Sequence, residues 1–255
     1  MTANEMAAEL DQQVDRASSF GSPGYEDFEY SSVLTDAMNV YVKQFIDRKN
    51  NRKGESLEET EVRSQGLSAL IKRGAALTVS ADQTGTFTNG TFYDLPTDFM
   101  YTIHEEGNID KFLCTDGTTN ISTTFNVIAH DEVSRLEKNK YKKPYYKTYG
   151  EAMTWRLVFS RENDGYTDNP PTLVAQTAKR HQLVTDGTFN VNRYSINYLQ
   201  NPPNIVVNRT TTSFQRNCIL DDSTHLPIID IAKSLLLERV QERELANMAS
   251  SKDLE

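Results

Sequence analysis

The sequence predicts an α+β fold, in which a helical bundle built from both ends of the chain carries an inserted antiparallel β domain. Two observations predict it. Apolar residues recur at three- and four-residue spacing near both ends of the 255-residue chain, and alternation with a period of two fills the middle. The predicted domains are 1–78 with 222–255, which form the helical part, and 79–221, which form the β part.

The helical ends are predicted from apolar stripes and from start signals. The stripes predict helices over 3–16 and 28–48. A third helix opens at Ser56 and Glu59, which have the spacing of a capping box, and ends near Gly74. The last helix begins near Pro227, because the first helical turn leaves backbone N–H groups unpaired and proline has none to lose.

The middle of the chain alternates apolar and polar residues, as half-buried strands do. Asn89 and Gly90 predict a hairpin with a type I′ turn, because both residues accept a positive φ. Further strands are predicted at 98–105, 124–129, 153–160, 180–185 and 193–207, with one or two helical turns over 130–139. In the strand 153–160, Trp155 lies on the core face and Arg156 points outside.

Four titratable side chains follow the predicted hairpin: Asp98, His104, Glu105 and Glu106. Alternation along a strand places His104 and Glu106 on one face and Glu105 on the other. A catalytic metal site usually needs three protein ligands, which this face does not supply locally. We therefore predict no metal, cofactor or catalytic site here, and interpret the segment as a strand that leaves the core at 104–107 and turns in solvent.

The segment 218–225 contains Cys218, Asp221, Asp222, Ser223 and His225, which are the residue types of a nucleophilic triad. Triads are assembled by geometry from distant segments, so local crowding is weak support for one. We favour a second interpretation, in which short polar side chains ahead of the last helix cap its start. A hydrolase that uses His104 or His225 stays an alternative.

A loop over 138–149 interleaves lysines with tyrosines. Such a loop could follow a phosphate backbone and stack on bases, or its tyrosines could anchor a protein interface. We favour the interface, because the chain carries a net charge of −9 and nucleic-acid affinity comes largely from Lys and Arg. The candidate contact residues, here and from Arg239 onward, are Lys138, Lys140, Tyr141, Lys142, Lys143, Tyr145, Tyr146, Arg239 and Arg243.

The sequence lacks the local signatures of several other classes. It contains no glycine-rich phosphate loop, no HExxH and no GxSxG. No apolar run has the length of a membrane helix, and the first residues do not resemble a signal peptide. We expect a protein that is not an enzyme, without a membrane segment, located inside a cell or a virion.

Several motifs, taken in order, resemble the head–tail adaptor or tail gatekeeper proteins of short-tailed bacteriophages. They are "YEDFEYSSVLTDAMNVYVKQF", "YDLPTDFMYTI", "HDEVSRLEKNKYKKP", "TWRLVF", "YSINYLQNPPNIVV" and "HLPIIDIAKSLLLERV", and they span most of residues 25–245. Within this group the chain is most similar to the neck ring proteins of crAss-like phages.

The resemblance implies a structural virion protein that is assembled in the cytoplasm of the host bacterium. Copies would form a ring, commonly twelve-fold, between the portal protein and the next tail or ring protein. Genomic DNA would pass through the lumen without specific binding, which an acidic wall favours. The resemblance implies no catalysis and no cofactor. A nucleic-acid-binding module that uses the 138–149 loop stays the alternative.

Overall fold

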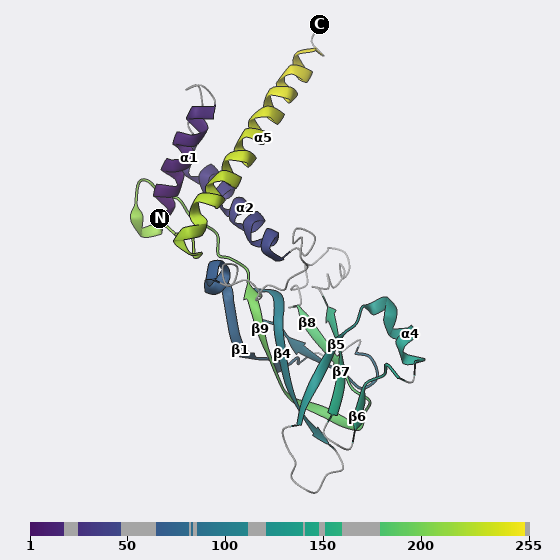
Figure 1. Cartoon of the computed structure of the whole chain (residues 1–255). Helices are drawn as coiled ribbons and strands as arrows, with labels where there is room; N and C mark the ends of the chain where they lie inside the picture. Colours follow the sequence, from purple (N-terminus) through teal and green to yellow (C-terminus); the bar gives the residue numbers. More distant parts are fainter. Residues whose placement is uncertain are drawn as a thin grey trace, which may run out of the picture. The chain divides into compact units, whose positions relative to one another are not determined.

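The computed structural model describes residues 1–17, 25–46, 65–81, 83, 86–111, 121–139, 141–147, 151–159 and 179–252. The chain divides into two compact units, a helical unit of Met1–Ile71 with Asn201–Glu255 and a β unit of Lys72–Gln200 (Figure 1). The mixed α+β class is therefore confirmed. Whether the predicted limits, 1–78 with 222–255 and 79–221, mark independently folding domains stays a prediction.

The helical unit contains α1 (Ala3–Ala17), α2 (Asp27–Ile46) and α5 (His225–Lys252), and both α1 and α2 pack against α5. Thr2 and Glu5 form a capping box at the start of α1. The Thr2 N–H donates to Glu5 Oε2 at 2.8 Å, and the Glu5 N–H donates to Thr2 Oγ1 at 3.2 Å. The predicted apolar stripes are buried, including Met6, Leu10, Leu34, Met38, Ile228 and Ala232. Their arrangement as a bundle stays a prediction.

The predicted third helix falls largely outside the described residues. From Gln65 the chain forms a short helical segment and the 3-10 turn η2 (Ser68–Leu70), and then enters strand β1 (Ile71–Ala76). The predicted helix end near Gly74 is therefore wrong. Gly74 lies inside β1 with a φ of 66°, a left-handed conformation that glycine adopts without steric cost.

Side chains of α2 hold an extended segment of the helical unit. The Val207 N–H donates to Ser31 Oγ at 2.9 Å, and the Ile205 N–H donates to Thr35 Oγ1 at 3.0 Å. Ser31 and Thr35 are four residues apart on α2, so their hydroxyls lie on one face and meet alternate amides of the segment. This pairing satisfies backbone groups that would otherwise be buried without partners.

The β unit contains a nine-stranded sheet. After β1 its strands are β2 (Thr78–Val79), β3 (Gly90–Asp94), β4 (Phe99–Lys111), β5 (Ile121–Val127), β6 (Tyr145–Lys147), β7 (Glu151–Phe159), β8 (Arg180–Val184) and β9 (Phe189–Gln200). The order is β1-β9-β4-β5-β7-β8-β3-β2, and β6 pairs with β7 off this path. The helical turns predicted over 130–139 are confirmed as η3 (His130–Glu132) and α4 (Val133–Glu137).

The two outer strands of this order are consecutive in the chain, because only Leu77 separates β1 from β2. The Leu77 N–H donates to the Tyr194 carbonyl of β9 at 2.9 Å, and the Ser80 N–H donates to the Phe92 carbonyl of β3 at 2.8 Å. The continuous segment β1–β2 thus pairs with β9 at its start and with β3 at its end, and the sheet is nearly closed on itself. A buried cluster joins its strands: Tyr93, Leu95, Phe99, Leu183, Tyr194, Ile196 and Tyr198.

The predicted sheet is antiparallel, which is wrong for one pair of strands. β5 and β7 run parallel, with Phe125 opposite Thr154. Parallel neighbours need a crossover connection, because the chain must return to the end from which the first strand started. The connection here contains η3, α4 and β6, so the helical insertion permits the parallel pairing.

The turn at Asn89 also differs from the prediction. The Gly90 N–H donates to the Phe87 carbonyl at 2.8 Å, which makes Thr88 and Asn89 the central residues; Asn89 has a φ of 59°, whereas Gly90 has no positive φ. The predicted type I′ hairpin is therefore wrong, and β3 pairs with β2 and β8 instead. Space requires glycine at position 90, because a Cβ there would lie 2.8 Å from the Phe87 carbonyl oxygen, a backbone atom, as well as 2.4 Å from Gln182 Nε2.

Candidate functional site

The predicted cluster of acidic residues around His104 is split between the two faces of β4. His104 Nε2 lies 3.4 Å from Glu106 Oε1, and both side chains are exposed, as strand alternation predicts. The Glu105 side chain is only 12 % exposed and belongs to the other face. The prediction that the strand turns in solvent here is wrong, because β4 continues to Lys111 alongside β9.

Glu105 belongs to a buried ring of four polar side chains from four strands. Its Oε1 lies 2.8 Å from Arg156 Nε, and its Oε2 accepts from the Tyr194 hydroxyl at 2.9 Å. His181 closes the ring, with Nε2 3.1 Å from Arg156 Nη1 and Nδ1 2.8 Å from the Tyr194 hydroxyl. The prediction that Arg156 points outside is wrong, because Glu105 supplies a buried partner for its charge.

One assignment of protons satisfies every bond of this Glu105–Arg156–His181–Tyr194 network. Arg156 Nη1 donates to His181 Nε2, so the neutral His181 carries its proton on Nδ1 and donates to Tyr194, which donates to Glu105; Arg156 and Glu105 are joined as an ion pair. Burial, and then the Arg156 guanidinium, lower the pKa of His181 to about 3. Burial raises the pKa of Glu105, and Arg156 opposes that change. Because its polar groups are largely buried and pair with one another, we interpret the network as structural.

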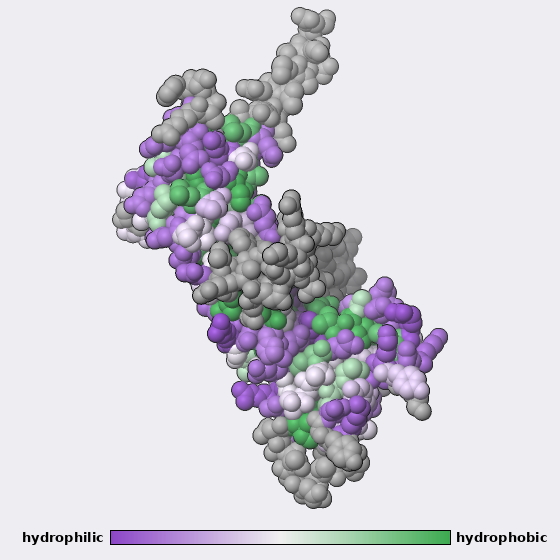
Figure 2. All heavy atoms as spheres, viewed as in Figure 1, coloured by the Kyte–Doolittle hydropathy of each residue, from purple (hydrophilic) through white to green (hydrophobic). Residues whose placement is uncertain are grey.

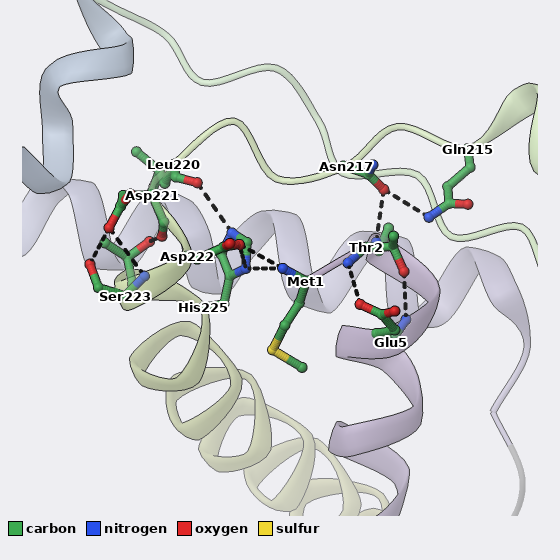
Figure 3. Close-up of polar contacts among 12 residues, drawn as sticks. Met1, Thr2, Glu5, Gln215, Asn217, Leu220, Asp221, Asp222, Ser223 and His225 are labelled. Atoms are coloured by element: carbon green, nitrogen blue, oxygen red, sulfur yellow. Dashed lines mark hydrogen bonds and ion pairs between the residues drawn. The ribbon is translucent and has the colours of Figure 1, made fainter.

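Asp221 caps the 3-10 turn η5 (Asp222–Thr224), which leads directly into α5 (Figure 3). Asp221 Oδ2 accepts from the Ser223 N–H at 3.2 Å and from the Ser223 hydroxyl at 2.5 Å. His225 Nε2 lies 3.2 Å from the Leu220 carbonyl, and His225 Nδ1 lies 3.2 Å from Asp222 Oδ1. The capping interpretation is therefore confirmed. The Ser223 hydroxyl bonds Asp221 rather than His225, so the segment does not form the Ser–His pair of a triad.

The start of α1 lies against the same segment (Figure 3). The Ala3 N–H donates to Asn217 Oδ1 at 2.9 Å, and the Met1 amine lies 2.6 Å from Asp222 Oδ1. Cys218 faces the Met38 thioether, with 3.8 Å between the sulfurs, and burial raises the pKa of its thiol. A raised pKa keeps the thiol protonated, which is the opposite of what a nucleophilic cysteine needs.

The Lys/Tyr loop between α4 and β6 is exposed and braced by hydrogen bonds. Trp155 Nε1–H donates to the Lys142 carbonyl at 2.9 Å. Asn139 Oδ1 accepts from the Tyr141 N–H at 3.1 Å, and the Asn139 carbonyl accepts from the Lys142 N–H at 3.1 Å. The Tyr141 side chain is 90 % exposed. The turn therefore holds an aromatic side chain out into solvent.

The other predicted contact residues of this loop differ in exposure. Lys138, Lys142 and Lys143 are exposed, Tyr145 and Tyr146 are half-buried in β6, and Lys140 lies outside the described residues. On the face shown in Figure 2, the surface over α4, ahead of this loop, is hydrophilic. The role of the loop as an interface stays a prediction.

Arg239, a predicted contact residue of the C-terminal segment, lines a small pocket. Its Nη2 lies 2.9 Å from Asp36 Oδ2, which joins α5 to α2. The pocket has a volume of about 230 Å³ and is lined by Tyr25, Phe28, Glu29, Ser32, Val33, Leu236 and Arg239. The Arg243 side chain lies outside the described part of the chain. No sequence pattern predicts this pocket. Its one local sign is Phe28, which stands apart from the apolar stripe of α2 and is 67 % exposed.

Metal-binding clusters and membrane-spanning helices are both absent from the described residues. Within them, no three His, Cys, Asp or Glu side chains converge as metal ligands would. No helix there is long and apolar enough to cross a membrane. The described residues combine a buried polar network with exposed candidate contact surfaces.

Comparison with known proteins indicates the class of this protein. Residues 1–247 match the family described as phage tail ring protein 3/4, and the chain belongs to this family. It is also 26 % identical over 258 residues to the Ring protein 4/5 of Bacteroides phage crAss001, covering 100 % of the chain and 96 % of that protein. The resemblance to crAss-like phage ring proteins is confirmed. The family indicates a structural role in a ring of the virion rather than an enzyme.

Proposed function

We propose that this protein forms a ring in the phage neck that acts as an adaptor, or tail gatekeeper, between the portal protein and the next tail or ring protein. Twelve copies would surround a channel for the genomic DNA. Membership of the tail ring family over residues 1–247 is the observation that carries this proposal. Assembly would take place in the cytoplasm of the host bacterium.

The charge of the chain supports passage of DNA without retention. The sequence has 36 acidic and 27 basic residues, a net charge of −9. Non-specific DNA binding requires Lys and Arg to neutralise phosphates, and a surface with the opposite balance repels the duplex. A ring of such copies would therefore let the genome slide past its wall.

Electron microscopy tests the proposal directly. The purified chain is imaged alone and after mixing with the portal protein of the same phage, and the neck of the virion is imaged in parallel. We expect twelve-fold rings of this chain against the portal, absent from images of the portal alone. A virion neck without a ring of this chain would overturn the proposal.

A second candidate function is nucleic-acid binding by the Lys/Tyr loop. The exposure of Lys138, Lys142 and Lys143 around Tyr141 is the observation that favours it. This candidate predicts DNA affinity that falls steeply with salt and falls again in a Lys142→Ala/Lys143→Ala variant. Our proposal predicts flat binding isotherms at low salt for both the parent chain and the variant.

A further inference from the structure

A ring of identical copies needs two different surfaces on each copy. Every contact in such a ring is heterologous, because the patch that one copy presents meets another patch on the next. Two such patches can be assigned on this chain, and the assignment rests on the proposed ring assembly. Two features of the described surface are suited to the roles, a projecting aromatic side chain and a small apolar pocket.

The projecting feature is Tyr141. It is the most exposed large apolar side chain among the described residues, at 90 %. The backbone of its turn is held by the Trp155 bond to Lys142 and by the two bonds to Asn139, so the backbone has little conformational freedom to lose on binding. Tyrosine is also one of the residues that contribute most to interface affinity.

The receiving feature is the pocket lined by α2 and α5. Its volume of about 230 Å³ is below the 300–1,000 Å³ of typical small-molecule sites but suits a single aromatic side chain. Phe28, Val33 and Leu236 supply apolar walls, and the Ser32 hydroxyl and the Glu29 carboxylate can accept from a phenol. Figure 2 shows hydrophobic residues at the surface over the helices, as expected of a contact region.

Charge complementarity favours a second copy of this chain as the occupant. Residues 138–147 contain five lysines and no acidic residue. The helical unit, which contains the pocket, has 21 acidic and 13 basic residues, a net charge of −8, against 15 and 14 in the β unit. The charge of Arg239 at the pocket is balanced by Asp36. The basic loop of one copy is therefore complementary in net charge to the helical unit of another copy.

We propose that Tyr141 of one copy inserts into the α2–α5 pocket of the next copy, while the lysines beside it face the acidic surface of the helical unit. The contact repeats around the ring, and each copy provides one loop and one pocket. The lysines increase the rate of encounter and fix the orientation, and the tyrosine provides most of the affinity.

Sedimentation velocity of the full chain over a range of concentrations tests the contact. We expect the parent chain to self-associate, and Tyr141→Ala to weaken association by about tenfold or more. Ser32→Trp, which fills the pocket from its own wall, is expected to have the same effect. The matched controls are Tyr101→Ala, an exposed tyrosine of β4, and Ser122→Trp, an exposed serine of β5, which should associate as the parent does.

Mixing the two variants provides a sharper test. The Ser32→Trp copy keeps its loop and the Tyr141→Ala copy keeps its pocket, so the mixture should form one-to-one dimers and no larger species. Unchanged association of either variant, or a mixture that stays monomeric, would overturn the inference.

Two other outcomes separate this inference from the proposed function. A parent chain that stays monomeric at every concentration, yet forms a ring in the virion, overturns the contact and leaves the proposed function standing. If exchanging Lys142 and Lys143 for glutamate abolishes DNA binding but leaves association intact, the loop serves nucleic acid and the inference fails.

Discussion

Glu105 and Arg156 form an ion pair 2.8 Å apart inside the β unit, although β5 lies between their strands in the sheet. About a tenth of each side chain is exposed. Both charges are therefore removed from water, and each depends on the other and on the hydroxyl and imidazole beside them. Breaking such a pair from one side leaves an uncompensated buried charge.

Glu105→Gln is therefore expected to lower the free energy of unfolding by about 3–5 kcal/mol. Urea denaturation followed by the fluorescence of Trp155, the sole tryptophan, measures the effect in the β unit. Glu132→Gln is the control, since it removes an exposed ion pair with Arg135 and should cost at most about 1 kcal/mol. Equal effects of the two substitutions would show that the buried network adds no special stability.

His181 makes stability depend on pH. Its pKa is lowered to about 3 in the folded protein, against about 6.5 for a histidine in the unfolded chain. Between these values the unfolded state binds the extra proton, so this contribution is complete above pH 6.5 and is lost as pH falls, by about 1.4 kcal/mol per pH unit. Urea denaturation between pH 7 and about pH 5 measures the slope.

His181→Gln is expected to remove that part of the slope, although it also lowers stability at pH 7 by breaking the network. His225, whose pKa burial also lowers, keeps its own contribution in both proteins, so the difference between the two slopes isolates His181. Glu105, with its raised pKa, acts in the opposite direction at more acidic pH. Parallel slopes for parent and variant would show that His181 is not held neutral.

Gly107 is predicted to be important for stability, because there is no room for a larger side chain between β4 and β5. A Cβ at this position of β4 would lie 2.4 Å from Cζ of Phe125 on β5. Gly107→Ala should therefore cost about 1–3 kcal/mol of unfolding free energy by overpacking, and shortening the neighbour with Phe125→Leu should recover part of it. Gly66→Ala is the control, because its Cβ would meet Thr224 Cγ2 at an ordinary 3.5 Å.

The C-terminal segment is predicted to act in assembly rather than in the stability of the β unit. A chain lacking residues 246–255 should show the parent's unfolding curve by Trp155 fluorescence. Its incorporation into rings on the portal, counted by electron microscopy, should fall. A control that replaces the same ten residues with a Gly/Ser segment of equal length separates the effect of length from that of sequence. Unchanged incorporation would remove this segment from the candidate surfaces.

Local patterns were sufficient for most strands and for the first two helices. The strand predicted at 180–185 is Arg180–Val184, and that predicted at 153–160 is Glu151–Phe159, because alternation is a property of the strand itself. The capping function of Asp221 was also predictable, since the residues that it serves follow directly in the sequence.

Features that depend on distant residues were not predictable in this way. Arg156 was assigned to the outer face because it alternates with Trp155 along the strand, and nothing near it in sequence reveals Glu105 on another strand. The parallel pairing of β5 with β7 likewise depends on the crossover connection between the two strands, which the local pattern of neither strand reveals. The α2–α5 pocket depends on how α5, which comes last in the chain, lies against α2.

The β1–β2 segment, which pairs with β9 before Leu77 and with β3 after it, bears on how copies can be joined. An open sheet carries backbone groups that can recruit a strand from another molecule, and such growth has no natural end. Here the Leu77 and Ser80 N–H groups, between and beyond the outer strands, are used within one copy, on β9 and β3. We therefore expect neighbouring copies to be joined by side-chain surfaces rather than by added strands, and such a heterologous contact forms a ring when its rotation closes.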